Sequence, residues 1–299
     1  MTGNREVRNG RNSAAQVREG NGEGGKEAGR GNRTGKSGSM AAGRRHRILS
    51  GQMLLYEFRN TIGNPYVHIF GILMPVAMVI IICRAAAAQM DAAAVPYAIT
   101  AIFLGTGALI PMATVLMGYG ISHAQELEKG IIQRMELFGI RPRAILCNRI
   151  LSEGIFMGIA YGIYFVPGYV VLDVQAPRSM GAVRYILCIL AYAAICFGLA
   201  HAISTLLQKF GATYCVVMLV YFLFMILGGM MGITYDQLPE AMQFVARQLP
   251  VTYICRDFST VWRGESYNFM PMLQAYLMLG ALTGILLIGA MRRTRRKLH

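Results

Sequence analysis

Charged residues are scarce in this sequence: Asp, Glu, Lys and Arg make up only 15% of its 299 residues, whereas hydrophobic residues make up 55%. An average soluble domain has about a quarter of its residues charged. A chain this apolar is not expected to stay in water, so a lipid bilayer is expected to surround most of it. Its Lys and Arg residues lie in the first 50 residues, in the last eight and between long uncharged stretches. Because they form no continuous basic face, we expect no nucleic-acid partner.

The sequence also lacks complete catalytic motifs. The stretch HAQELE at 123–128 fails the zinc-hydrolase pattern H-E-x-x-H, and no G-x-S-x-G occurs. The stretch GNRTGKS at 31–37 resembles a phosphate-binding loop, but Arg30 stands where the first glycine is required and no apolar strand precedes it. We therefore predict no catalytic residue, no nucleotide site and no cofactor bound by this chain.

Cysteine pairs with metal-ligand spacing are missing as well. The six cysteines contain no C-x-x-C pair and no histidine at ligand spacing, so no metal site is predicted. Most of them lie in apolar stretches, where cysteine behaves as a small hydrophobic residue. The sequence leaves open whether Cys83 and Cys255, both expected near the outer face, form a disulfide.

Long apolar stretches organise the rest of the chain. Residues 1–43 are rich in glycine and lack aromatic residues, which predicts a disordered basic tail. Residues 44–299 are predicted to form one all-α integral membrane domain, because a spanning helix needs about 20 mostly apolar residues. Six stretches qualify: residues 66–83, 97–120, 150–172, 185–207, 212–233 and 270–290.

Basic residues near these stretches predict the orientation. With the N-terminus inside, the inner segments hold fifteen Lys and Arg residues and the outer segments hold six. Basic residues concentrate on the cytoplasmic side of membrane proteins. We therefore expect a multi-pass protein of the plasma membrane with both termini in the cytoplasm.

Three connecting segments are predicted to contain helices. Residues 47–65 are typical of an amphipathic helix on the inner surface, and residues 234–268 of short helices at the outer interface, anchored by Trp262 and tyrosines. The segment 123–138 is predicted to be a single amphipathic helix that ends at Gly139 and Pro142. Its expected apolar stripe consists of Leu127, Ile131, Met135 and Phe138, and its polar surface of Glu126, Glu128, Lys129, Gln133 and Glu136. A stripe flanked by both charge signs suits a protein groove better than an anionic lipid surface.

Several of these features together resemble the permease subunit of the type-2 family of ABC exporters. They are the helix before the first span, the run Glu126-Leu127-Glu128-Lys129-Gly130 followed by Arg134 and Arg141-Pro142, and the stretch QLP…ARQLPVTY at 237–253. The resemblance implies two permease subunits, identical or different, above two cytosolic ATPase subunits that use ATP and magnesium. It also implies that residues 123–138 are a coupling helix, with Glu126, Leu127, Glu128, Lys129, Gly130, Arg134, Met135 and Phe138 at the ATPase interface.

Ionisable residues inside spans are costly and are candidates for function. His68 and Glu153 are expected close enough to the inner surface to reach it, and His201 is expected to bond a neighbouring helix. The glycine pair Gly158–Gly162 is predicted to allow close helix packing. The favoured function is ATP-driven export of an amphiphilic or hydrophobic substrate. The alternatives are an ion-coupled secondary transporter, for which few midplane ionisable residues exist, and a membrane-embedded hydrolase.

Overall fold

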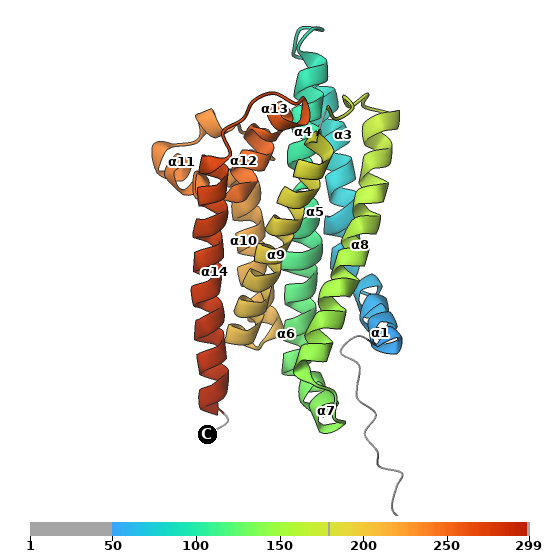
Figure 1. Cartoon of the computed structure of the whole chain (residues 1–299), viewed down its shortest axis with the longest axis vertical. Coiled ribbons are helices and arrows are strands. Elements are labelled where there is room, and N and C mark those ends of the chain that lie inside the picture. Colours follow the sequence, from blue (N-terminus) through green and yellow to red (C-terminus); the bar gives the residue numbers. More distant parts are fainter. Residues whose placement is uncertain (1–49, 179, 298–299) are drawn as a thin grey trace, which may run out of the picture. The chain divides into compact units, whose positions relative to one another are not determined.

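The computed structural model describes residues 50–178 and 180–297, and the predicted tail at 1–43 lies outside them. Within these ranges every regular element is helical, as predicted (Figure 1). In chain order the elements are α1 (Gly51–Ile62), α2 (Pro65–His68), η1 (Ile69–Leu73), α3 (Met74–Ala87), α4 (Val95–Gly107), α5 (Leu109–Pro111), η2 (Met112–Tyr119), α6 (Gly120–Glu128), α7 (Ile131–Leu137), α8 (Pro142–Val170), α9 (Gly181–Leu207), α10 (Phe210–Leu227), η3 (Tyr235–Gln237), α11 (Glu240–Ala246), α12 (Pro250–Arg256), α13 (Phe258–Trp262) and α14 (Met270–Lys297).

Six helical runs are long and apolar enough to cross a membrane, which confirms the predicted number of spans. They are Pro65–Ala87, Val95–Glu128, Pro142–Val170, Gly181–Leu207, Phe210–Leu227 and Met270–Arg293. The predicted boundaries were wrong mainly at the second and third runs. The second run continues to Glu128, and the third begins at Pro142. The predicted boundaries followed the apolar stretches, but a helix can continue through charged residues because they do not interrupt its backbone hydrogen bonds.

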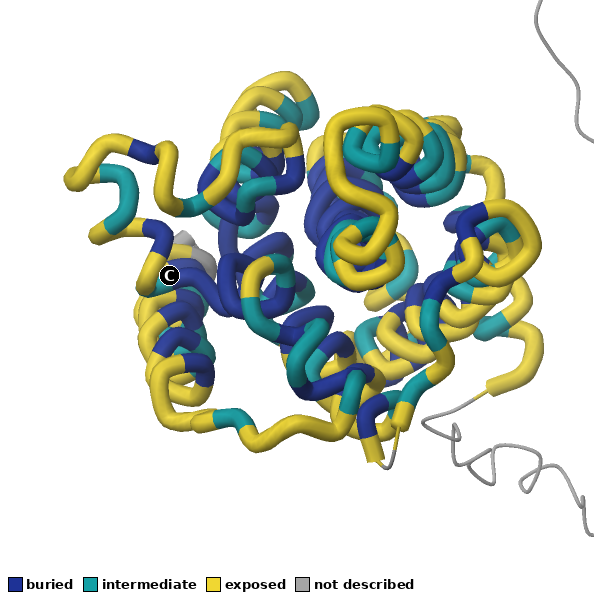
Figure 2. Tube along the Cα trace, turned by 90° about the horizontal axis from the view of Figure 1, so that it is seen from above, coloured by how far each residue is buried: buried dark blue, intermediate teal, exposed yellow. Residues whose placement is uncertain are grey.

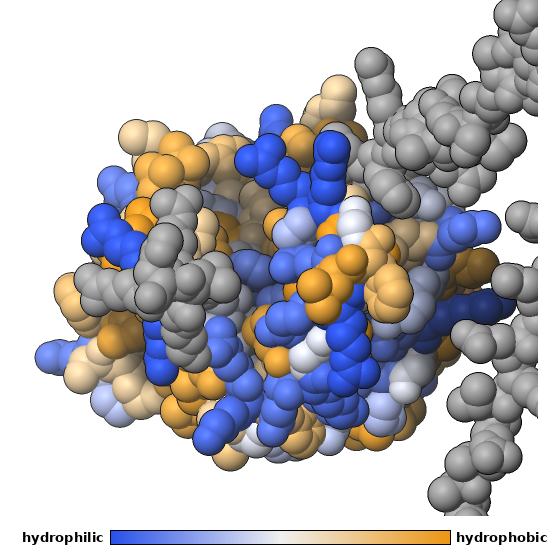
Figure 3. Space-filling view, turned by 90° about the horizontal axis from the view of Figure 1, so that it is seen from below, coloured by the Kyte–Doolittle hydropathy of each residue, from blue (hydrophilic) through white to orange (hydrophobic). Residues whose placement is uncertain are grey.

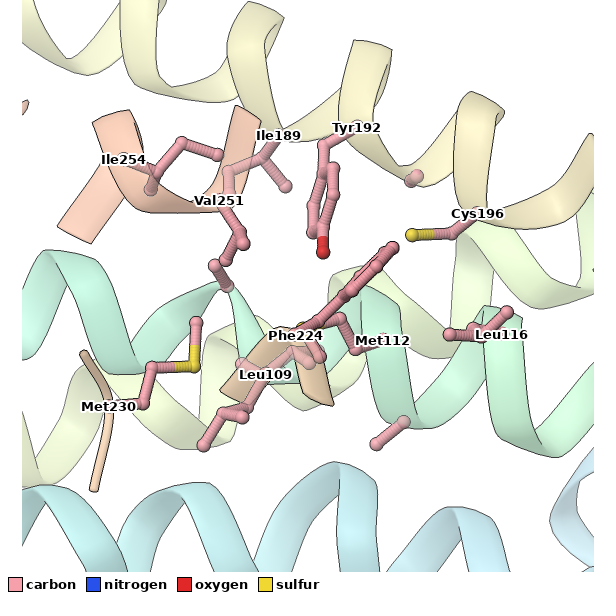
Figure 4. Packing of buried hydrophobic residues seen from close by; sticks show 14 of the residues in the cluster. Leu109, Met112, Leu116, Ile189, Tyr192, Cys196, Phe224, Met230, Val251 and Ile254 are labelled. Atoms are coloured by element: carbon pink, nitrogen blue, oxygen red, sulfur yellow. The ribbon is translucent and has the colours of Figure 1, made fainter. Parts of the chain in front are cut away.

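The second run forms the centre of the bundle. It is the most buried of the six, and buried residues concentrate around it when the bundle is seen from one end (Figure 2). Leu109, Met112 and Leu116 of this run face Tyr192 and Cys196 of α9 across the core (Figure 4).

Close helix approach occurs at a different glycine from the predicted pair. A Cβ at Gly71 would lie 2.8 Å from the Thr114 side chain, so only glycine fits there between the first and second runs. Gly158 and Gly162 have open space beside them in the described structure, so neither packs closely against a helix of this chain, and their role in close helix packing stays a prediction.

The central run is broken where α4 ends at Gly107, four residues before Pro111. Proline has no N–H, so the Gly107 carbonyl lacks its helical donor. In lipid an unpaired carbonyl is costly. The Tyr161 hydroxyl donates to this oxygen at 2.8 Å. Two more tyrosine hydroxyls donate to carbonyl groups of the preceding helical turn. Tyr164 donates to the Phe103 carbonyl at 2.7 Å and Tyr185 to the Leu104 carbonyl at 2.8 Å.

The two ends of the bundle carry different elements, and we name them the α7 end, which also holds α1, and the α13 end, which holds α11 and α12 (Figure 1). The short helices predicted in residues 234–268 are confirmed as η3, α11, α12 and α13. Trp262 is only 2% exposed and donates to the Gln175 carbonyl at 2.7 Å, so it is a core residue and not the predicted interfacial anchor. All six cysteines lie in the described part of the chain and are free, including Cys83 and Cys255.

Candidate functional site

The segment predicted as one helix at 123–138 is two helices joined by an elbow. α6 is the direct continuation of the central run and ends at Glu128, and α7 starts at Ile131. Gly130 between them has φ +65°, the left-handed region in which a side chain is strained and which glycine occupies freely. Pro142 does not end this segment as predicted but opens α8, where a proline without an N–H is tolerated.

The elbow contains the charged side chains of Glu128, Lys129 and Arg134. Glu128 Oε2 accepts the Phe210 backbone N–H at 2.7 Å, so this carboxylate caps the first turn of α10. Arg134 Nη2 donates to the Lys129 carbonyl at 3.0 Å and closes the elbow from the α7 side. Glu128, Gly130 and Arg134 therefore fix the elbow and its contact with α10, and the Lys129 side chain is exposed.

α7 presents two apolar surfaces. Ile131 and Met135 line a groove of about 480 Å³ whose other wall includes Met53 and Tyr56 of α1. At the opposite tip, Leu137 is 87% exposed and Phe138 is 84% exposed. The expected continuous stripe does not exist, because the elbow separates Leu127 from α7. Seen from this end, hydrophobic side chains lie among hydrophilic ones (Figure 3).

α1 is amphipathic as predicted, and it turns its polar side inward. Its buried residues are Glu57 and Thr61, one turn apart, whereas Leu55 and Ile62 are exposed. An interfacial helix is expected to direct apolar residues toward lipid. The polar side of α1 therefore packs on the bundle, mainly against α8.

Arg149 of α8 joins α1 to the central run. Its guanidinium donates to Glu57 Oε2 at 2.9 Å and to Glu126 Oε1 of α6, and all three side chains are buried. Asn60 Nδ2 of α1 donates to the same Glu126 oxygen at 3.0 Å. We call these four residues the Arg149 cluster. Glu126 was expected on an exposed polar surface, and that placement was wrong.

Three buried glutamates, Glu57, Glu126 and Glu153, lie near the single buried arginine of this site, Arg149. Glu153, one turn beyond Arg149, is 5% exposed and does not reach the surface as expected. Its Oε1 accepts the Thr61 hydroxyl at 3.1 Å, and its Oε2 has no protein partner among the described residues. In the cluster, burial raises the pKa of Glu57, and the attraction of Arg149 offsets only part of that shift.

The two predicted intramembrane histidines have different surroundings. His201 Nδ1 lies 2.6 Å from the Tyr119 hydroxyl, which confirms the expected bond to a neighbouring helix. Its ring also stacks on His123 at 4.9 Å, and His123 Nδ1 lies 3.4 Å from Arg149 Nη1. His68 Nε2 instead lies 2.6 Å from the Ile62 carbonyl, where it closes the connection from α1 to the first run.

Glu57, His123 and Arg149 were not predicted from the sequence as a group. A signal existed in the spacing, because Glu57–Thr61 and Arg149–Glu153 are both polar pairs four residues apart, which places each pair on one face of its helix. The pairing between these helices joins residues 92 positions apart, which no local pattern reveals.

Among known protein families, a model described as ABC-2 type transporter matches residues 51–256. The match begins at the first residue of α1 and ends at the last residue of α12, so it includes the elbow and the Arg149 cluster. No curated protein and no solved structure matches the chain.

Proposed function

Because the chain belongs to the ABC-2 type transporter family and is thus a permease component of an ABC transporter, we propose that it is a half-transporter without its own nucleotide site. It pairs with a second permease subunit, and cytosolic ATPase subunits on separate chains supply the energy of ATP hydrolysis. The substrate is amphiphilic or hydrophobic and is moved out of the cell. The α7 end faces the cytoplasm, and both chain termini are cytoplasmic.

The observation that supports this proposal is the exposed apolar tip of α7. Leu137 and Phe138 lie at the end of a two-turn helix, beyond the elbow. Exposing two large apolar side chains in water is unfavourable unless a partner covers them. An apolar helix end fits the groove of a protein partner, and the flanking Arg134 and Glu136 are exposed for polar contacts around it.

The elbow connects this tip to the centre of the bundle. α6 continues from the central run without interruption, so a displacement of α7 acts on the most buried helix. The bond of Glu128 to α10 and the Arg149 cluster tie the same region to α10, α8 and α1. We propose that ATPase closure reaches the spans through these contacts.

The test is ATP-driven transport by the chain purified from native membranes with its ATPase and reconstituted into vesicles. Leu137→Ser combined with Phe138→Ser is expected to abolish ATPase association and transport, while thermal stability stays unchanged because both side chains are exposed. Glu128→Lys is expected to uncouple ATP hydrolysis from transport. The matched control is Glu240→Lys, an exposed charge reversal on α11 at the opposite end. ATP-dependent transport that persists in both test variants would refute the coupling role.

The ion-coupled alternative has one observation in its favour: one buried Glu153 oxygen has no partner within the part of the chain that the structure describes. Such a carrier needs ionisable groups at a substrate site near the bilayer midplane. In vesicles without ATPase, transport driven by an imposed proton gradient and lost in Glu153→Gln would establish this alternative over the half-transporter.

A further inference from the structure

A groove of about 420 Å³ runs between α8 and α9 near the α13 end, away from the elbow and the Arg149 cluster. Its floor includes Gly154 and Gly158 of α8, and no atom lies within 4 Å of a Cβ built at either position. Its edges include Ile186 and Leu190 of α9, which are both exposed. Since α8 and α9 are candidate spans, the groove opens toward the bilayer.

Four aromatic residues of the groove carry a polar atom, and three of them donate it to the backbone of this chain, whereas the fourth, Tyr169, is exposed. The Tyr161 hydroxyl donates to the Gly107 carbonyl, the Tyr185 hydroxyl to the Leu104 carbonyl and Trp262 Nε1 to the Gln175 carbonyl. These bonds satisfy backbone carbonyl groups, so the parts of the three side chains that line the groove are their apolar ring faces and edges. A ligand with polar groups inside it would lose its hydrogen bonds to water without replacement. The part of the groove around Tyr161, Tyr185 and Trp262 therefore favours hydrocarbon.

Along α9 the groove is about as long as one leaflet is deep, and along α8 it is longer. At 1.5 Å per residue, its wall spans about 12 Å along α9 from Ala182 to Leu190 and about 22 Å along α8 from Gly154 to Tyr169. The hydrocarbon core of a bilayer is about 30 Å thick, so one leaflet is about 15 Å deep. An extended acyl chain occupies such a narrow groove more completely than a compact molecule.

Positive charge lies at the mouth of the groove. Pro177 lines it, and the next residue, Arg178, donates its backbone N–H to the Trp262 carbonyl at 2.9 Å and has an exposed side chain. Arg184, in the first turn of α9, is exposed too, but its guanidinium lies 5.9 Å from the centre of the Phe269 ring, so Arg178 is the cation next to the groove, and Asp173 lies five residues before it in the same loop. An apolar groove with a cation at its end complements the acyl chain and phosphate of one phospholipid.

We propose that this groove is a phospholipid-binding site, with one acyl chain between α8 and α9 and the phosphate beside Arg178. The lipid fills the gap between two spans that would otherwise lack contact on one side. This site is separate from the α7 elbow and does not depend on the proposed coupling function.

Trp262 makes the site directly measurable, because it lines the groove and is the single tryptophan of the chain. The chain is reconstituted in phosphatidylglycerol with or without bromine in the acyl chains, and quenching of Trp262 fluorescence by the bromine is measured. Gly158→Leu fills the groove and is expected to reduce quenching at least twofold. Gly158→Ala adds a single methyl group in open space and is expected to give an intermediate value. The matched control is Gly284→Leu on α14, which also has open space beside it.

Quenching that Gly158→Leu leaves unchanged, or that Gly284→Leu lowers equally, would overturn the site. Gel filtration of each variant shows whether it is folded. If Gly158→Leu aggregates, Gly158→Ala decides the test, because unchanged quenching in that variant would also overturn the site. The headgroup is tested with Arg178→Ala. This variant is expected to lose the preference for brominated phosphatidylglycerol over brominated phosphatidylcholine, and an unchanged preference would overturn the assignment of the phosphate to Arg178.

Discussion

Replacement of Arg149 by methionine tests the energetics of the buried cluster. Arg149→Met keeps a long side chain but removes the charge that Glu57 and Glu126 share. Breaking a buried ion pair by removing one partner costs about 3–5 kcal/mol, because the remaining charge stays buried without compensation. We expect a loss of this size in stability at neutral pH.

The loss should depend on pH in a defined direction. Burial already raises the pKa of Glu57 above its usual 4.5, and without Arg149 this pKa rises further. A folded-state pKa above the unfolded value means that the folded protein holds the proton more tightly. Stability is therefore lost as the pH rises from 4.5 through the raised pKa, at about 1.4 kcal/mol for each unit of pKa shift. The defect of Arg149→Met should be largest near pH 8 and small at pH 5.

The assay is the apparent thermal midpoint, measured by gel filtration of detergent-solubilised protein after heating at a series of pH values. Arg143→Met is the matched control, because Arg143 lies on the same helix and is exposed, and such surface changes are worth about 0.5 kcal/mol or less. Equal midpoints for the two variants, or a defect of Arg149→Met that does not change between pH 5 and pH 8, would refute the electrostatic account.

Three further substitutions test individual contacts. Gly130→Ala places a side chain in the left-handed region and is expected to cost about 1–2 kcal/mol and to lower the coupling of ATP hydrolysis to transport, measured as ATP consumed per substrate moved. Tyr161→Phe leaves the Gly107 carbonyl without a donor and is expected to cost about 1 kcal/mol, seen as a lower thermal midpoint; an unchanged midpoint would contradict the role of this hydroxyl. Glu128→Ala removes the cap of α10 and is expected to cost about 0.5–2 kcal/mol, whereas Glu128→Gln should retain part of the bond to the Phe210 N–H.

The number of spans and the short helices at the α13 end could be predicted from the sequence, because both depend on local composition. Runs of about 20 apolar residues mark spans in lipid, and Pro239 and Pro250 mark where short helices begin. The elbow could not be predicted in the same way. Leu127, Ile131 and Met135 repeat at helical spacing, and the positive φ of Gly130 that interrupts them depends on how α6 and α7 pack.

The candidate site was harder to predict, because its residues come from distant segments. Arg149 looks like one of several basic residues in a loop, and only the contact between α1 and α8 shows that it is buried. The inward polar side of α1 was also missed. In a soluble protein the apolar side of a helix faces the interior. A helix at the surface of a bilayer directs its apolar side toward lipid, so its polar side can face the protein.

The placement of the charges also indicates what they contribute. A buried ion pair can often be replaced by apolar residues without loss of stability, so its presence is weak evidence that it stabilises the fold. Arg149 nevertheless reaches two helices that have no covalent connection near this point, α1 and α6, and its planar guanidinium fixes both carboxylates at once. Apolar contacts would allow these helices to slide, whereas directed bonds allow few arrangements. The cluster therefore sets the position of α6, and with it the position of the elbow, more than it adds to the stability of the bundle.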